Sequence, residues 1–251
     1  MTRTTRLVAF VGAAALAAAL STQSAPSSPT HTCVKKDELR FRAADGTRLI
    51  GHRFGGKRPG RRTTVVLAHM SEGDLCSSAR HARRLAARGF FVFPFDFRGH
   101  GFSEGSRDHA TAVADTIAAV RAVRSLGARK VVVAGASLGG IAAVIAATRL
   151  RLPVQGVVSI SGPAAIEGQL DARAAAPLLR VPTLYVAAEQ DQNPPYDFAA
   201  EARELHDLTG TPEKRVELVS GSLHGTFLVD GSARVRAALE RFLRNPAASV
   251  P

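Results

Sequence analysis

The feature that most constrains this chain is an alternation of two patterns along most of its length. Two strands flank the Asp45-Gly46 turn pair, at 38–43 and 47–54, and read as a hairpin. Six apolar runs read as buried strands, at 63–68, 90–96, 130–134, 154–160, 183–188 and 214–219. Helical spacing of apolar residues lies between or after them, at 77–89, 108–126, 138–150, 171–180, 196–208 and 232–244. The alternation predicts an α/β fold: a mostly parallel eight-stranded sheet with helices on both faces. Pro94 predicts that the strand at 90–96 lies at an edge or carries a bulge.

Two stretches have the pattern G-x-S-x-G, which marks the nucleophile of many hydrolases: GFSEG at 101–105 and GASLG at 135–139. Ser137 follows a predicted strand directly and precedes a helix without a loop. A turn this tight exposes the serine Oγ above the sheet and places the backbone N–H of Leu138 at a helix N-terminus. The alternative is a glycine-rich turn that binds phosphate. Ser103 lies in a polar loop, where a structural role is expected.

The two motifs together resemble a known superfamily. GASLGG after KVVVA, with DFRGHGFSEG earlier in the chain, is similar to the α/β-hydrolases. Within them it resembles the serine-hydrolase branch of monoacylglycerol lipases, lysophospholipases, small esterases and S33-type peptidases. The resemblance covers residues 38–245. It implies the α/β-hydrolase fold and the chain order nucleophile, acid, histidine.

The resemblance directs the search for the other catalytic residues. Asp191 follows the strand at 183–188 and fits the position of the acid, with Glu189 on the same loop as the alternative. His224 follows the last strand and fits the position of the base, which activates the Ser137 hydroxyl. The other histidines are expected in structural, linker or surface positions: His31, His52, His69, His81, His100, His109 and His206.

The second oxyanion donor is expected in the loop after the strand at 63–68. The His-Gly-x segment of the family is here His69-Met70-Ser71. Alignment with it implies that the backbone N–H of Ser71 acts with that of Leu138, and Met70 is the alternative donor. Methionine in place of glycine either reshapes the acyl pocket or puts the donor assignment in doubt.

The N-terminus has a different character from the rest. Arg3 and Arg6 precede an apolar stretch at 7–20 and a small, polar exit, which predicts a signal peptide at 1–25 and export to the cell envelope or medium. An uncleaved membrane anchor is the alternative, although the stretch is short for a span. A linker at 26–37 and an α/β-hydrolase domain at 38–251 follow. Cys33 and Cys76 predict one disulfide, with two free buried thiols as the alternative.

The net charge of +12 comes mostly from arginines scattered through the predicted helices. Without a basic stripe or a known module, no nucleic-acid partner is expected. A basic surface favours contact with an anionic cell envelope, or serves solubility alone. The sequence has no C-x-x-C and no closely spaced histidine pair, so neither a metal nor another cofactor is expected.

These observations predict a secreted serine hydrolase that acts on a small-molecule ester. The segment 161–182 is too short for a full cap domain, so the site is expected to be open. An open site favours a carboxylesterase for short- to medium-chain esters, with an acyl-enzyme on Ser137. The alternatives are a serine peptidase of similar fold and a non-catalytic envelope-binding protein that keeps the fold.

Overall fold

The computed structural model describes residues 32–34 and 38–247. The predicted signal peptide at 1–25 and most of the linker at 26–37 lie outside these residues. The division of the chain into these parts therefore stays a prediction.

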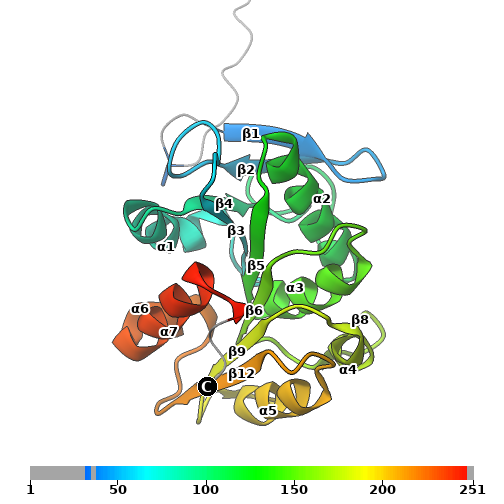
Figure 1. Ribbon diagram of the computed structural model, residues 1–251. Helices are drawn as coiled ribbons and strands as arrows, with labels where there is room; N and C mark the ends of the chain where they lie inside the picture. The colour runs from blue at the N-terminus through cyan, green and yellow to red at the C-terminus, as the bar shows by residue number, and fades with distance from the viewer. Residues whose placement is uncertain (1–31, 35–37, 248–251) are drawn as a thin grey trace, which may run out of the picture.

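A twisted eight-stranded sheet forms the centre of the molecule, with the strand order β1-β2-β4-β3-β5-β6-β9-β12 (Figure 1). The pairings of β1 with β2 and of β2 with β4 are antiparallel, and every pairing from β4 to β12 is parallel. The predicted fold class is thus confirmed. The strands span Glu38–Arg42 (β1), Arg48–His52 (β2), Thr63–Ala68 (β3), Phe91–Phe95 (β4), Lys130–Ala136 (β5), Gly156–Ile160 (β6), Thr183–Ala188 (β9) and Lys214–Val219 (β12).

Helices cover both faces of the sheet (Figure 1). One face carries α1 (Leu75–Ala87), α6 (Gly225–Gly231) and α7 (Ala233–Arg244). The other carries α2 (Ala112–Ser125), α3 (Leu138–Arg149), α4 (Ala172–Ala175) and α5 (Phe198–Leu208). Alternate residues of a strand point to opposite faces, so β5 supplies Val131 and Val133 to one apolar core and Val132 and Ala134 to the other.

Several short elements were absent from the sequence-based prediction. They are the hairpins β7–β8 (Ala165–Ile166, Leu170–Asp171) and β10–β11 (Gln192–Asn193, Tyr196–Asp197), the 3₁₀ turn His109–Thr111, and α6. The helix expected near 171–180 is only α4 followed by a 3₁₀ turn at Ala176–Leu178. Such pieces are too short for a periodic pattern to develop, and α6 also begins and ends with glycine.

The expectation that Pro94 marks an edge strand is wrong, because β4 lies between β2 and β3. Val92 and Asp96 donate their backbone N–H groups toward the β2 segment, at 3.0 Å to Phe54 O and 2.8 Å to Ile50 O. The nitrogen of Pro94 therefore faces the same side, between these two bonds. The strand tolerates proline there because the β2 segment pairs with β4 only at Val92, before the proline, and at Phe95, after it.

A short connection links β6 to β9. Residues 161–182 hold the β7–β8 hairpin, α4 and one 3₁₀ turn. This agrees with the prediction that the segment between these two strands holds no large cap domain.

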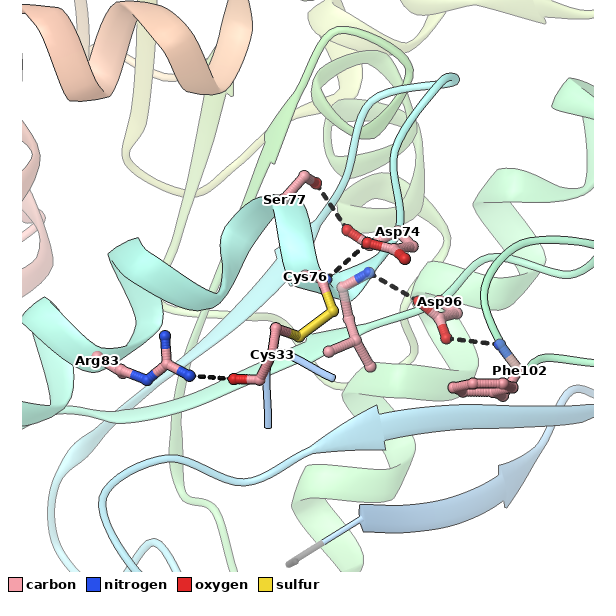
Figure 2. Close-up of a disulfide and its surroundings, with 8 residues drawn as sticks. Cys33, Asp74, Cys76, Ser77, Arg83, Asp96 and Phe102 are labelled. Carbon is pink, nitrogen blue, oxygen red and sulfur yellow. Dashed lines mark hydrogen bonds between the residues drawn. A yellow bond between two sulfur atoms is a disulfide. The ribbon is translucent and has the colours of Figure 1, made fainter. Parts of the chain in front are cut away.

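A disulfide joins Cys33 to Cys76, as the cysteine count predicts. Cys76 lies in the first turn of α1, where Asp74 caps the helix by accepting a hydrogen bond from Cys76 N at 2.8 Å. Figure 2 shows the bridge beside this cap, with the Arg83 guanidinium donating to the carbonyl oxygen of Cys33. The bridge thus fastens the chain ahead of β1 to the start of α1.

Candidate active site

Ser137 lies at a sharp turn between β5 and α3. Its backbone has φ 52° and ψ −116°, a conformation that non-glycine residues rarely adopt. Its N–H donates to Ile160 O of β6 at 2.9 Å, which fixes the turn against the neighbouring strand. A side chain at Gly135 would overlap the Gly139 carbonyl, and one at Gly139 would overlap the Ala68 carbonyl. The small residues of the motif are therefore a steric requirement of this turn.

Asp191 and His224 form a hydrogen-bonded pair. His224 Nδ1 lies 2.9 and 3.1 Å from the two carboxylate oxygens of Asp191, whose side chain is only 4% exposed. The ring of Phe198 packs against the imidazole at a centroid distance of 4.5 Å. Glu189, the alternative acid, is exposed and accepts a hydrogen bond from Ser220 Oγ at 3.4 Å. The geometry thus brings Asp191, and not Glu189, to His224.

The backbone after His224 is held by a residue that sequence reasoning missed. His224 is the residue just before the first turn of α6, and Gly225 follows with φ +55°. Gly225 N donates to Ser161 Oγ at 3.0 Å. Ser161 is buried at the end of β6 and itself has φ 47°. Its only signal in the sequence is a serine directly after a predicted strand, which on its own is weak.

The three candidate catalytic residues follow parallel strands: Ser137 follows β5, Asp191 follows β9 and His224 follows β12. Because the carboxyl ends of parallel strands lie at one edge of a sheet, all three stand at that edge, where ligands of such folds bind. Within the described chain, Ser137 Oγ makes no hydrogen bond to His224. Such bonds are often long in a free enzyme and shorten when substrate binds.

The predicted oxyanion loop is held by a buried, neutral histidine. His69 Nδ1 lies 2.6 Å from Met70 O, and His69 Nε2 accepts the N–H of Phe97 at 3.0 Å. Burial lowers the pKa of His69 to about 4, so the ring is neutral at pH 7 and donates through Nδ1. In a trans peptide the C=O and the following N–H point in opposite directions. Holding Met70 O toward the imidazole therefore turns the Ser71 N–H away from it.

A second imidazole holds the next peptide of the same loop. His100 is buried, and its Nε2 lies 2.8 Å from Ser71 O while its Nδ1 lies 2.9 Å from Arg98 O. Both partners are carbonyl oxygens, so the ring can donate a hydrogen bond to each of these two segments. The rings of His69 and His100 lie 5.0 Å apart. Two histidines predicted to be structural thus support the loop that carries the predicted donor.

The Met70 side chain lies against the loop of His224. A side chain at Gly225 would overlap Met70 Sδ, and Thr226 Oγ1 lies 3.9 Å from that sulfur. Met70 also packs on the apolar core beneath α6. The departure from glycine thus fills space next to the candidate base. Leu138 begins α3, so its N–H is one of those without an acceptor inside the helix. Ser71, Leu138 and Met70 stay predictions as oxyanion donors.

Ser103 occupies a closed hydrogen-bonding position. Its Oγ donates to Asp96 O at 2.8 Å and accepts the N–H of Ile50 at 2.9 Å. The Asp96 carboxylate accepts from Leu75 N at 2.7 Å and from Phe102 N at 3.1 Å (Figure 2). The loop therefore ties the starts of β2 and α1 together, in the structural role that the sequence analysis expected.

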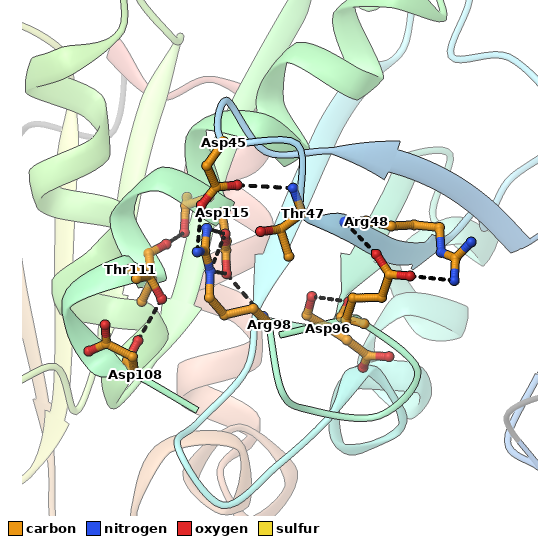
Figure 3. A network of polar contacts seen from close by, with 12 residues as sticks. Asp45, Thr47, Arg48, Asp96, Arg98, Asp108, Thr111 and Asp115 are labelled. Carbon is orange, nitrogen blue, oxygen red and sulfur yellow. Dashed lines mark hydrogen bonds and ion pairs between the residues drawn. The ribbon is translucent and has the colours of Figure 1, made fainter. Parts of the chain in front are cut away.

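Arg98 anchors the same loop to α2. Its guanidinium contacts the fully buried Asp115 through Nη2 at 2.7 Å and Nε at 3.1 Å, and Nη1 lies 2.7 Å from Asp45 (Figure 3). The hydrogen bond to Asp115 raises the pKa of Arg98 above its usual value. These bonds connect the β1–β2 turn, the GFSEG loop and α2.

Across residues 32–34 and 38–247, no group of three or more histidine, cysteine, aspartate or glutamate side chains is arranged to hold a metal ion. No helix in that part of the chain has the length and apolar character needed to cross a membrane.

Comparisons with known sequences find similarity over part of the chain. Residues 59–169 match the family model described as serine aminopeptidase, S33. The uncharacterized protein YfhR of Escherichia coli K12 is 33% identical over 110 residues, which are 41% of this chain and 39% of that protein. YfhR of Salmonella typhi is 30% identical over 115 residues, 43% and 39% of the two chains. The chain thus matches about two fifths of the length of these curated relatives.

Solved structures are similar over most of the fold. The Pyrococcus furiosus esterase Pf2001 has a TM-score of 0.69 at 17% identity, covering 82% of this chain and 91% of its own. An enol-lactonase from Burkholderia xenovorans LB400 has a TM-score of 0.68 at 19% identity, and the match covers 82% of this chain and 100% of that one. A monoacylglycerol lipase from Paleococcus ferrophilus has a TM-score of 0.64 at 20% identity, and the match covers 78% of this chain and 98% of that one. At these identities the likeness concerns the fold.

Proposed function

We propose that this chain is an α/β-hydrolase and, within that superfamily, a serine carboxylesterase with an acyl-enzyme on Ser137. The observation that carries the proposal is the juxtaposition at one sheet edge. A strained serine turn after β5 stands at the same edge as a histidine whose Nδ1 is held by a buried carboxylate. This arrangement suits acyl transfer by an activated hydroxyl.

The proposed reaction uses only side chains and backbone of this chain. Asp191 holds Nδ1 of His224, so Nε2 is the nitrogen left to take the proton of Ser137 Oγ. Oγ then attacks the ester carbonyl carbon, and the negative oxygen rests on the N–H groups of Leu138 and Ser71. His224 returns the proton to the leaving alcohol. Water, activated in the same way, releases the acid and restores Ser137.

Two features support esters of short to medium chain length as substrates. The segment 161–182 adds only a short hairpin, α4 and a 3₁₀ turn beside the site, which leaves it open. Leu223 and Phe227 flank His224 and are 46% and 62% exposed. Exposed apolar side chains at this position would contact the acyl or alcohol group of a substrate.

The test uses a fluorophosphonate probe, which labels an activated serine. The wild-type protein is expected to react, Ser137→Ala to lose all labelling, and Ser103→Ala to keep it. Ser103→Ala is a matched control because it alters the same residue type in the same sequence pattern. A folded wild-type protein that does not react would contradict the proposal and favour a non-catalytic binding protein.

A serine peptidase is the second candidate, favoured by the description of the family model that matches residues 59–169. Nitrophenyl esters of increasing chain length, measured beside aminoacyl anilides, separate the two. Faster turnover of esters that peaks at short or medium chains supports the esterase. Turnover of the anilides at a comparable kcat/KM would assign the peptidase instead.

We also propose that the protein is exported, on the basis of Arg3, Arg6 and the apolar stretch at 7–20. The positive charge of +12 supports contact with an anionic envelope. Intact mass measurement of the protein produced in its host would show loss of the N-terminal segment. A full-length mass from the soluble intracellular fraction would contradict export.

A further inference from the structure

A cavity lies behind the candidate active site, between the sheet and helices α1, α6 and α7. Its volume is about 60 Å³, and neither Ser137 nor His224 lines it. The floor is apolar and comes from β3, β5 and β6, with Leu67, Ala134 and Ile160 among its residues. Leu85 of α1 and Leu239 of α7 form the walls. At about 10–15 Å³ for each water-sized group, this space fits an alkyl chain of about four to six carbons.

The cavity opens into a groove with an excess of positive charge. Arg84, Arg236 and Glu240 line both the cavity and the groove. The groove adds Arg80, Arg88 and Asp230, so four arginines face two carboxylates.

Two of the ion pairs in this groove have long N–O distances, and one arginine forms no ion pair among the described residues. Arg80 and Arg84 lie 3.5 and 3.7 Å from Asp230, and Arg88 lies 3.1 Å from Glu240. Arg236 donates to the carbonyl oxygens of Val229 and Asp230, and within the described chain it pairs with no carboxylate. The mouth therefore has unmatched positive charge next to an apolar interior.

A buried polar ring on the cavity wall also lacks a strong hydrogen-bond partner in the described chain. The side chain of His81 is only 9% exposed, and within the described residues neither of its ring nitrogens makes a hydrogen bond of good geometry, with the backbone of Thr226 as a weak partner. Its nearest carboxylate oxygen, on Asp230, is 3.7 Å from Nε2. Burying a polar group without a hydrogen bond is unfavourable, so a ligand that offers one would be favoured here.

We infer that the cavity and its arginine-lined mouth form a second ligand site, separate from Ser137, which takes an alkyl carboxylate of short to medium chain length. The alkyl chain fills the apolar interior, and the carboxylate lies at the mouth near Arg84 and Arg236. An acid of this kind is also what the proposed ester hydrolysis would release, and that link alone rests on the proposed function. Ala136 and Thr226 line the cavity next to Ser137 and His224, so an occupant would lie beneath the candidate site.

Titration calorimetry with sodium octanoate tests the inference on the wild-type protein. Octanoate is expected to bind more tightly than octanol, and octanol more tightly than octylammonium. In the straight-chain carboxylate series, each added methylene should strengthen binding by about fourfold until the interior is full near six carbons. Equal binding of octanol and octanoate, or no binding of octanoate, would overturn the inference.

Variants locate the binding. Arg84→Gln should weaken octanoate binding several-fold, while Arg121→Gln, a change at an exposed arginine of α2 on the opposite face, should leave it unchanged. Leu239→Phe and Leu85→Phe should each abolish binding by filling the cavity. Thermal unfolding identifies which of these two stays folded, and undiminished binding by a folded filled variant would overturn the inference.

One further variant separates this site from the active site. Ser137→Ala should bind octanoate as the wild type does, whether or not the wild type hydrolyses esters. Loss of octanoate binding in a folded Ser137→Ala protein would place the carboxylate at Ser137 and overturn the inference.

Discussion

The two G-x-S-x-G stretches have the same pattern and opposite environments. Ser137 has φ 52°, lies between two elements of regular structure, and makes no hydrogen bond to a neighbouring side chain in the described chain. Ser103 lies in a loop where its hydroxyl both donates to Asp96 O and accepts from Ile50 N. A hydroxyl with both bonds committed stabilises its own loop and is not free to attack a substrate. The pattern therefore specifies small residues around a serine, and the flanking elements decide its role.

The largest difference is expected in activity. Ser137→Ala should lower ester hydrolysis by about 10⁴-fold or more, because no other group supplies the attacking oxygen. Ser103→Ala should keep kcat/KM within a few-fold of the wild type. Steady-state kinetics on a nitrophenyl ester checks both. Similar losses in two folded variants would show that the two serines do not differ as their environments indicate.

The second test compares the two carboxylates, Asp191 and Glu189, on the loop that supplies the candidate acid. Asp191→Asn should lower kcat by about 10⁴-fold, because the amide cannot hold His224 in the tautomer that accepts the Ser137 proton. Glu189→Gln is the matched control on the same loop, and activity should change by less than about twofold, since the Glu189 carboxylate is hydrogen-bonded only to Ser220 within the described residues. A larger effect at Glu189 than at Asp191 would reverse the assignment of the acid.

His69 connects the loop at residues 69–71 to the segment that begins the GFSEG loop, through Met70 O and Phe97 N. The stability of the protein should therefore depend on pH through this histidine. Folding lowers the pKa of this histidine from 6.5 to about 4, so the unfolded chain binds more protons between these values. Its contribution is therefore fully present above pH 6.5 and is lost as the pH falls toward 4, by about 3 kcal/mol in all.

Urea unfolding at pH 7 and pH 4 measures this loss. His69→Asn removes the titrating group and keeps an amide donor for Met70 O, so its free energy of unfolding should depend less steeply on pH. Ser106→Ala, at an exposed residue that does not titrate, should keep the wild-type dependence. Equal slopes for all three proteins would contradict the neutral, buried state of His69.

The smallest effect is expected for stability at Ser103. Ser103→Ala leaves the Ile50 N–H without its acceptor and should lower the free energy of unfolding by about 1–3 kcal/mol. Urea unfolding measures this change. Ser106→Ala, at an exposed serine of the same loop, should change stability by less than about 0.5 kcal/mol. A stability cost at Ser106 as large as that at Ser103 would show that the loop is not held through Ser103.

Much of the fold and the position of the candidate site could be predicted from local pattern. The strands at 63–68, 183–188 and 214–219 have the predicted bounds, because each is a complete apolar or alternating run between turn residues. The positions of Ser137, Asp191 and His224 after strands follow from the same strand pattern, together with the order of nucleophile, acid and histidine in the family that the sequence resembles.

What could not be predicted depends on contacts between distant segments. The bond from Gly225 N to Ser161 Oγ joins residues 64 positions apart, and nothing near either residue indicates it. The place of the Met70 side chain against Gly225 and Thr226 is likewise set by packing. The cavity behind β5 depends on how α1 and α7 stand on the sheet, which is a property of the whole fold.

The Cys33–Cys76 bridge closes a covalent ring that contains β1, β2 and β3. Within that ring lies a turn rich in trypsin sites, with Lys57, Arg61 and Arg62. A single cut there opens the ring and leaves the two fragments attached through sulfur. The nicked protein should run as one band on a gel without reductant and as two bands after reduction. The bridge thereby makes this turn a place where the backbone can be broken while the molecule stays whole.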